Sequence, residues 1–220
     1  MISAVSWKQA GWRRALLSAW LVLILAGVAG AQAPAAGGAG SITAIQGKVA
    51  IQRGANQLAA VYGTPVQVGD RIATSPASQV TITLADGTQL ELDQSSTLVI
   101  IANRLNATGQ RAETRVDLFE GLVHSLVRFA PGNAPNYEVH TPNAVAAARG
   151  TNYDTDYVKG VPRKERPGCL EFTDVTVFEG SVAVTNATAP NPVTVDVTHG
   201  LKTSVACLLA PSTAAAIGAG

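Results

Sequence analysis

The chain has 220 residues, of which 47% are hydrophobic and 14% are charged, and its formal net charge is +1 at pH 7. This length accommodates one sizeable domain with a small appendage. Because the chain has no broad basic field with which to attract nucleic acid or anionic lipid, we expect no nucleic-acid partner.

The N-terminal segment has the layout of a secretory signal peptide. Three cations precede the apolar run of residues 15–31, and small residues offer cleavage sites after Ala31 or Ala33. We therefore predict a signal peptide at residues 1–33 and a flexible linker at residues 34–41. The alternative is an uncleaved membrane anchor, since the apolar run is at the low end of the roughly 17–25 residues that span a bilayer.

The central part of the chain, residues 42–209, has the pattern of an all-β domain. Apolar and polar residues alternate at period two, and Gly, Pro, Asn or Asp interrupts the alternation every ten residues or so. No stretch has a convincing helical period, so we expect no substantial helix. The small residues of the last segment, 210–220, predict a disordered tail.

The clearest hairpin comprises residues 80–92, in which alternating strands flank Asp86 and Gly87. This pair predicts a two-residue turn in which both residues have positive φ. The continuously apolar residues 97–101 follow, and they predict a strand that is buried on both faces.

One strand motif recurs along the chain. Residues 117–127 and 176–186 share an aromatic residue, Glu, Gly and Val in register, and residues 44–54 are a looser copy. A glycine inside a strand usually marks a bend. Three bent strands predict a compact β-sandwich or a short β-solenoid-like stack, because the copies are too few and too unevenly spaced for a long solenoid.

Cys169 and Cys207 both lie in the part of the chain that we expect to be exported. An oxidising compartment favours a disulfide between them. Such a bond would close a loop of roughly 38 residues and stabilise the fold by about 4 kcal/mol if its effect is on chain entropy. Two separate buried thiols are the alternative.

Residues 141–157 combine glycine, threonines and aspartates directly after His140, which makes this segment a candidate for a phosphate-binding or metal-binding site. One glycine is too few for a phosphate loop. Asp154 and Asp156 share one strand face, but with the scattered histidines they form no compact calcium or zinc ligand set. We therefore expect a structural crossover between strands, with no metal and no cofactor.

A hydrolase would need a nucleophile with its base. The sequence contains no Gly-x-Ser-x-Gly elbow and no lone cysteine suited to a histidine partner. A pair of glycosidase carboxylates is not singled out by any spacing. We expect no catalytic residue, and a carbohydrate-active enzyme of β architecture remains the alternative.

The segment 158–169 is more promising for function. It concentrates Lys159, Arg163, Lys164 and Arg166 between prolines, against a single acidic residue. Loops on rigid scaffolds often carry recognition. The segment is either a solvated loop or a contact site for an acidic protein or an anionic glycan, held in place by the cysteine bridge.

Several motifs, taken in order, resemble the FecR domain of bacterial envelope proteins. That family shows Gly-Asp-x-Ile-x-Thr, then Asp-Gly-Ser/Thr, Thr-Pro-x-Ala, Gly-Thr-x-Phe and finally Glu-Gly-x-Val. The matching residues, which we expect to be structural, are Gly69, Asp70, Ile72, Thr74, Asp86, Gly87, Thr88, Thr141, Pro142, Ala144, Arg149, Gly150, Thr151, Tyr153, Glu179, Gly180 and Val182. Tyr153 stands where the family has phenylalanine, and residues 158–169 are an insertion relative to its pattern.

The resemblance covers about residues 42–206 and implies a bacterial protein that is periplasmic or secreted. FecR regulators of iron-citrate uptake also carry a cytoplasmic segment of several dozen residues that binds a sigma factor, whereas about 14 residues precede the apolar run here. We therefore expect a non-catalytic exported module that binds an unknown envelope protein or glycan. The alternative is a sigma-factor-linked regulator that residues 15–31 anchor in the inner membrane.

Overall fold

The computed structural model describes residues 38–132 and 135–218. The predicted signal peptide and the first half of the predicted linker lie outside the described residues. Within the described ranges, no helix has the length and apolar character that a membrane crossing requires.

The described residues form seventeen strands and no helix, which confirms the predicted all-β class. The strands are β1 (Gly38–Gln46), β2 (Val49–Arg53), β3 (Asn56–Ala59), β4 (Pro65–Gln67), β5 (Arg71–Thr74), β6 (Gln79–Leu84), β7 (Gln89–Leu92), β8 (Thr97–Leu105), β9 (Arg111–Leu126), β10 (Tyr137–His140), β11 (Ala144–Ala148), β12 (Asn152–Lys159), β13 (Glu171–Glu179), β14 (Ser181–Asn186), β15 (Thr194–Thr198), β16 (Leu201–Ala206) and β17 (Ala215–Ala216).

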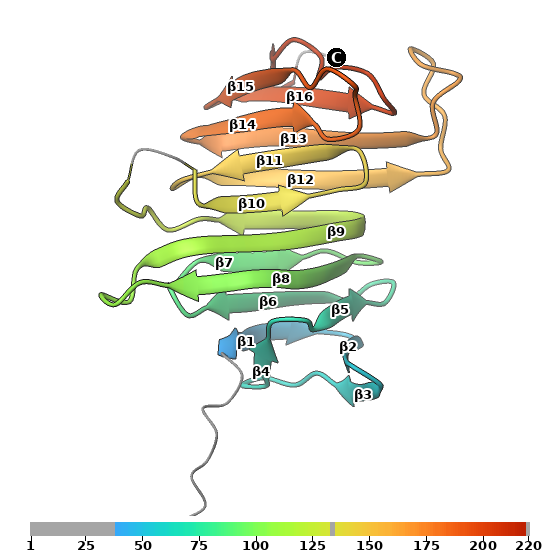
Figure 1. The fold of residues 1–220 in the computed structure, drawn as a ribbon. Coiled ribbons are helices and arrows are strands. Elements are labelled where there is room, and N and C mark those ends of the chain that lie inside the picture. Colours follow the sequence, from blue (N-terminus) through green and yellow to red (C-terminus); the bar gives the residue numbers. More distant parts are fainter. Residues whose placement is uncertain (1–37, 133–134, 219–220) are drawn as a thin grey trace, which may run out of the picture. The chain divides into compact units, whose positions relative to one another are not determined.

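The strands belong to one mixed sheet that is folded into two layers, with β9 common to both. Layer A contains, in hydrogen-bonded order, β4, β1, β6, β7, β9, β12, β13, β16 and β17. Layer B contains β3, β2, β5, β8, β9, β10, β11, β14 and β15. Only the β9–β10 pair is parallel among these pairs. Figure 1 shows the strands stacked roughly in chain order, with β3 at one end and β15 and β16 at the other.

Glycines carry the chain from one layer to the other. In β9, residues 111–120 pair in layer B and residues 121–126 pair in layer A. The bend is at Gly121, whose φ is 79°. Gly47 and Gly180 occupy the equivalent bends after β1 and β13, with φ of 75° and 83°. The recurring glycine motif therefore marks the layer crossings, as a bent strand predicts.

Two local predictions from the sequence are wrong. In the hairpin of residues 80–92, only Gly87 has positive φ, and its backbone N–H donates to the C=O of Leu84, so three residues make the turn. In β8, Leu98 and Ile100 are fully buried, but Ile101 is 39% exposed. Each layer packs against a single partner layer, so a strand in it has only one buried face.

The hydrophobic core lies between the two layers. Its largest fully buried aliphatic side chains are Ile42, Ile82, Leu90 and Leu92 from layer A and Ile51, Ile72, Leu98, Ile100 and Leu118 from layer B. Tyr137 and Tyr153 meet in the core edge to face, with ring centroids 6.4 Å apart. The Tyr137 hydroxyl also lies 3.0 Å from the Oγ of Ser125. Burial raises the pKa of both tyrosines well above the ordinary value.

The domain is longer at both ends than the sequence predicts. Strand β1 begins at Gly38 and pairs with β4 and β6, so the predicted linker contributes to the sheet. At the other end, β17 pairs with β16, and the N–H of Ser212 donates to the C=O of Ser204. The segment predicted to be a disordered tail is therefore bonded to layer A as far as Ile217, because the open edge of β16 offers it backbone partners.

Candidate functional site

The Gly-Asp-x-Ile-x-Thr motif holds the turn between β4 and β5. Gly69 has a φ of 92°, which favours glycine. Asp70 is fully buried and accepts two hydrogen bonds from the Arg53 guanidinium, at 2.8 and 2.7 Å. It also accepts the N–H of Gln67 at 2.8 Å. The hydrogen bond to Asp70 raises the pKa of Arg53, and the pair ties β2 to the turn.

Two motif threonines join separate strands by their hydroxyls. Thr74 Oγ1 accepts the N–H of Ser96 at 2.9 Å. Thr141 Oγ1 lies 2.7 Å from Thr173 Oγ1, and both side chains are buried. Pro142, the residue after Thr141, is exposed and lies outside the strands. Its missing backbone N–H therefore removes no hydrogen bond from the sheet. The two hydroxyl contacts hold separate segments of the chain together.

The side chains of the Asp-Gly-Thr motif are bonded to a buried arginine, Arg111, which was not predicted from the sequence. Arg111 is 3% exposed. Its Nη1 donates to Asp86 Oδ2 at 2.5 Å and to Thr88 Oγ1 at 2.8 Å. Its Nε donates to Asn136 and its Nη2 to the C=O of Arg128. Because its guanidinium is bonded on every side, the Arg111 charge is available to no ligand.

Two further motifs lie where segments of the chain approach each other closely. The Arg149 guanidinium lies 5.0 Å from the centre of the Phe129 ring. A Cβ added at Gly150 would lie 2.9 Å from Phe129 Cα, and one added at Gly180 would lie 2.8 Å from Thr151 Cγ2. Both glycines have positive φ, so close packing and backbone conformation both exclude a larger residue.

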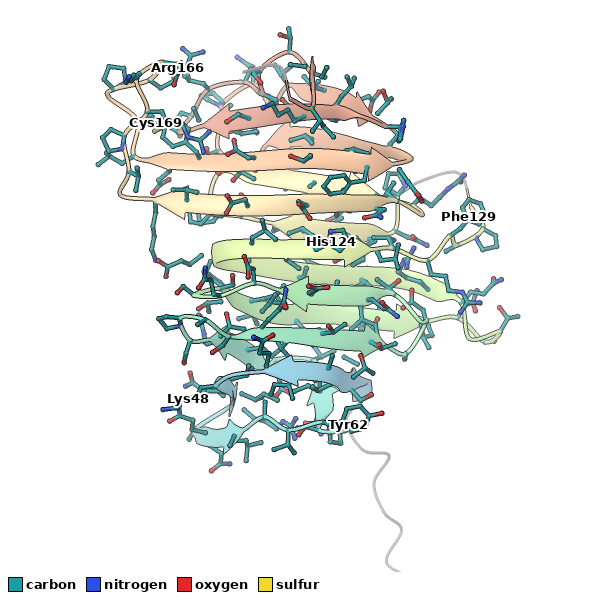
Figure 2. All side chains as sticks on the ribbon, turned by 180° about the vertical axis from the view of Figure 1, so that it is seen from behind. Lys48, Tyr62, His124, Phe129, Arg166 and Cys169 are labelled. Carbon is teal, nitrogen blue, oxygen red and sulfur yellow. A yellow bond between two sulfur atoms is a disulfide. The ribbon has the colours of Figure 1, made fainter. Side chains whose placement is uncertain are left out.

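The insertion between β12 and β13 is fixed at both ends and in its middle. The N–H of Gly160 donates to the C=O of Leu170 at 2.8 Å. A disulfide joins Cys169 to Cys207, with the two Cα atoms 5.8 Å apart. This confirms the predicted bridge. Figure 2 shows Cys169 and Arg166 together at one corner of the molecule.

Arg163 clamps the middle of the insertion onto layer A. Its Nη1 and Nη2 donate to the two carboxylate oxygens of Asp174 at 2.9 and 2.5 Å. Its guanidinium also lies 4.2 Å from the centre of the Phe172 ring and bonds Ser204 Oγ. The Asp174 carboxylate raises the pKa of Arg163. Arg163 therefore positions the loop and has its charge already compensated.

The other predicted contact residues are divided between paired and free. Lys159 Nζ lies 3.2 Å from Glu120 Oε2 in a half-exposed pair, which contributes little to stability. Lys164 and Arg166 are exposed and form no ion pair with a described residue. Of the four predicted cations, these two are available to a partner.

Apolar side chains lie beside Arg166, one of the two free cations. A cavity of about 280 Å³ is lined by Arg166, Phe172 and Leu209, among others. Exposed apolar side chains lie in both of the chain segments that the disulfide joins. Together with the free cations they form what we call the loop surface: Val161, Lys164, Arg166, Leu170, Leu208 and Leu209. Leu208 and Leu209 were not predicted as contact residues, because they stand in the segment next to the predicted tail.

The outer face of layer A carries the aspartates considered as metal ligands. Asp154, Asp156 and Asp174 line a second cavity of about 410 Å³. His124 Nδ1 lies 2.6 Å from Asp154 Oδ1, and this hydrogen bond raises the pKa of His124. His140 is bonded instead to Glu138 on its own strand. The structure brings no three metal-ligating side chains into a suitable group within the described residues.

Asp156 has the most perturbed carboxyl group on this face. It lies opposite Asp174 across the β12–β13 pair. Burial, and then the neighbouring Asp174 charge, raise the pKa of Asp156 to about 6. This face can therefore change its charge in the mildly acidic range.

Comparison with known proteins identifies the fold family. The FecR protein family matches residues 70–183. No curated protein matches the sequence. Two crystal structures of a "putative anti-sigma factor" from Parabacteroides distasonis ATCC 8503 are similar, with TM-scores of 0.48 and 0.47 and identities of 16% and 17%. Each similarity covers 62% of this chain and 54% of that chain, so the protein spans about half the length of its structural neighbour. Since the family match extends over more than half of the sequence and includes the motifs that hold the two layers together, this chain belongs to the FecR family.

Proposed function

We propose that this chain is a non-catalytic, exported FecR module that binds an envelope protein through the loop surface. The observation that supports this proposal is the fixed insertion. The disulfide and the Arg163–Asp174 clamp hold Lys164 and Arg166 outward on a rigid support. A preorganised loop loses little conformational entropy on binding, so more of the contact energy appears as affinity.

The chemistry of the loop surface favours a protein with acidic groups. Protein interfaces have an apolar centre and a polar rim. Leu170, Leu208 and Leu209 provide exposed apolar area, and Lys164 and Arg166 provide positive charge beside it. Exposed cations contribute to rate of association and to partner choice more than to affinity. An anionic glycan would use the cations and leave the leucines without a role.

Export is supported by the disulfide. Disulfides persist in oxidising compartments such as the periplasm and are rare in the cytosol. The bond between Cys169 and Cys207 fastens the loop surface, so its formation and the proposed binding require the same compartment.

Site-specific crosslinking tests the proposed contact. A photo-reactive residue at position Leu208, in cells that produce the full chain, is expected to capture one protein. The additional change Arg166→Glu is expected to reduce the yield of this crosslink at least tenfold. Lys48→Glu makes the same charge change at an exposed site at the other end of the stack and should leave the yield unchanged. Equal capture by both variants contradicts the proposal, and capture of glycan alone replaces the protein partner.

A second candidate function is a membrane-anchored regulator of transmembrane signalling linked to a sigma factor. The apolar run of residues 15–31 favours it. The intact mass of the protein from the envelope of its native host distinguishes the two. A mass that begins after Ala31 or Ala33 supports the exported module, whereas a full-length mass in the membrane fraction supports the anchored regulator.

A further inference from the structure

The edge of layer B at β3 is a second available surface. β3 pairs with β2 on one side, and no described strand pairs with its other side. All four of its residues are exposed. Figure 1 shows β3 at the end of the stack opposite β15 and β16, and Figure 2 shows Tyr62 at that same end, away from Cys169.

This edge lacks the usual protection against strand pairing. Residues 54–69 contain no charged side chain. Three apolar side chains are exposed close to β3, with Leu58 at 38%, Val61 at 61% and Tyr62 at 75%. Native edge strands are commonly protected by charge, proline or a bulge. Strand β4, at the corresponding edge of layer A, begins with a proline, whereas β3 has neither proline nor charge.

The backbone of β3 has two free donors and two free acceptors. The N–H of Ala60 donates to the C=O of Val49, so Ala60 faces β2. Because the bonding direction alternates along an antiparallel strand, Leu58 and Asn56 also face β2. The N–H and C=O groups of Gln57 and Ala59 therefore point away from the sheet.

We propose that two copies of this chain associate by antiparallel pairing of β3 with β3 about a twofold axis. A twofold interface uses the same surface on both copies, and an uncharged strand opposes itself without like-charge repulsion. Arg53, which lies opposite Asn56 in the β2–β3 pair, is already bonded to buried Asp70. The pairing would give hydrogen-bond partners to the outward backbone groups of Gln57 and Ala59. It would also continue layer B from one copy into the next and cover part of the apolar area around Tyr62.

The size of the contact sets its strength. A pair of four-residue strands with a few flanking side chains is smaller than a standard interface of about 1,600 Å². We therefore expect a reversible dimer with a Kd of about 10–100 µM. Its formation does not depend on the loop surface at the other end of the stack.

Sedimentation velocity on the secreted product of the full sequence, from about 5 to 500 µM, tests the proposal. We expect the mass to rise from one chain to two. Ala59→Pro removes an outward N–H without breaking a β2–β3 bond, and should weaken the dimer at least tenfold. Leu58→Lys, which keeps the backbone intact and opposes like charges across the axis, should do the same.

The matched control is Thr198→Pro. The N–H of His199 donates to the C=O of Gly180, so by the same alternation the N–H of Thr198 points outward from β15, the far edge of layer B. This variant should dimerise as the unmodified protein does. Circular dichroism confirms that each variant is folded. A protein that stays monomeric at every concentration, or a dimer of unchanged affinity in Ala59→Pro and Leu58→Lys, overturns the proposal.

Discussion

At the scale of single residues, three arginines of this protein hold turns and loops to the sheet. Arg53, Arg111 and Arg163 each bind one aspartate, and each does so at a point where a turn or loop meets the sheet. The pairs at Arg53 and Arg111 include a fully or almost fully buried aspartate. Removal of Arg53 would leave the buried Asp70 charge without compensation, and removal of either partner of the Arg111–Asp86 pair would likewise leave a buried charge. Such a loss typically costs roughly 3–5 kcal/mol. Lys164 and Arg166 differ because they are exposed and make no such bond.

Asp156 provides a prediction about pH. Its pKa is raised from 3.8 to about 6, so the folded state holds the proton more tightly than the unfolded chain. As pH rises from about 4 through 6, the folded state loses stability relative to the unfolded state. Asp156→Asn removes this loss, because the amide stays uncharged. The variant should therefore be more stable than the unmodified protein at pH 8 and nearly equal to it at pH 4.

Urea unfolding at the two pH values measures this difference. The control is Asp196→Asn on β15, where the carboxylate is exposed to solvent. At this exposed site we expect only a small effect on the unfolding free energy at pH 8. An Asp156→Asn variant that is less stable at pH 8 would show that the Asp156 carboxylate has a favourable partner in the folded protein.

At the scale of elements, the layer crossings depend on glycine, and Gly121 is the sharpest case. Its φ is 79°, and an added Cβ would lie 2.2 Å from Ser96 Oγ and 2.8 Å from Ser96 Cα. Gly121→Ala combines an unfavourable backbone conformation with overpacking, so we expect a loss of about 2–4 kcal/mol in unfolding free energy. Gly109→Ala is the matched control, since its φ is 76° but no atom lies within 4 Å of the added Cβ. It should cost about 1–2 kcal/mol, which is the backbone effect alone. Equal losses in the two variants would mean that the contact with Ser96 relaxes at no cost.

The same elements show how much of the fold is predictable from sequence. Alternation at period two identified the strands, and the repeated glycine identified the bends, because both are local properties of the chain. The single buried face of β8 and the pairing of the C-terminal segment with β16 depend on which layers lie alongside, which no local pattern records. The partners of Arg111 and Arg163 were missed for a related reason. Arg111 lies 25 residues from both Asp86 and Asn136, and only the register of distant strands brings these side chains together.

For the candidate site, the loop and the disulfide could be predicted from the sequence. Which of the cations are paired within the protein, and which are free, could not. A cluster of four basic residues gives no indication of which ones are bound internally. The structure assigns Arg163 to Asp174 and pairs Lys159 with Glu120, and it leaves Lys164 and Arg166 exposed. The apolar part of the loop surface comes from residues on both sides of the disulfide, so it could be predicted only by assuming that bond.

At the scale of the whole molecule, the disulfide joins the insertion to the residue after β16 and so encloses β13, β14, β15 and β16 in one loop. Closing a loop with a sequence separation of 38 restricts the unfolded chain. The replacement of both cysteines by serine should therefore lower the unfolding free energy by about 4 kcal/mol. The Arg163 clamp does not depend on the disulfide, so Asp174 should still hold the middle of the insertion in this variant.

Denaturant unfolding with and without a reducing agent checks this expectation. Reduction should destabilise the unmodified protein to the level of the Cys169→Ser/Cys207→Ser variant and leave the variant itself unchanged. The double variant should also crosslink its partner from Leu208 less efficiently, because no covalent bond then joins Cys207 and the segment after it to the insertion. The β3 dimer, at the other end of the stack, should form with unchanged affinity. A parallel loss of partner capture and dimerisation would mean that the whole domain, and not the loop surface alone, needs the disulfide.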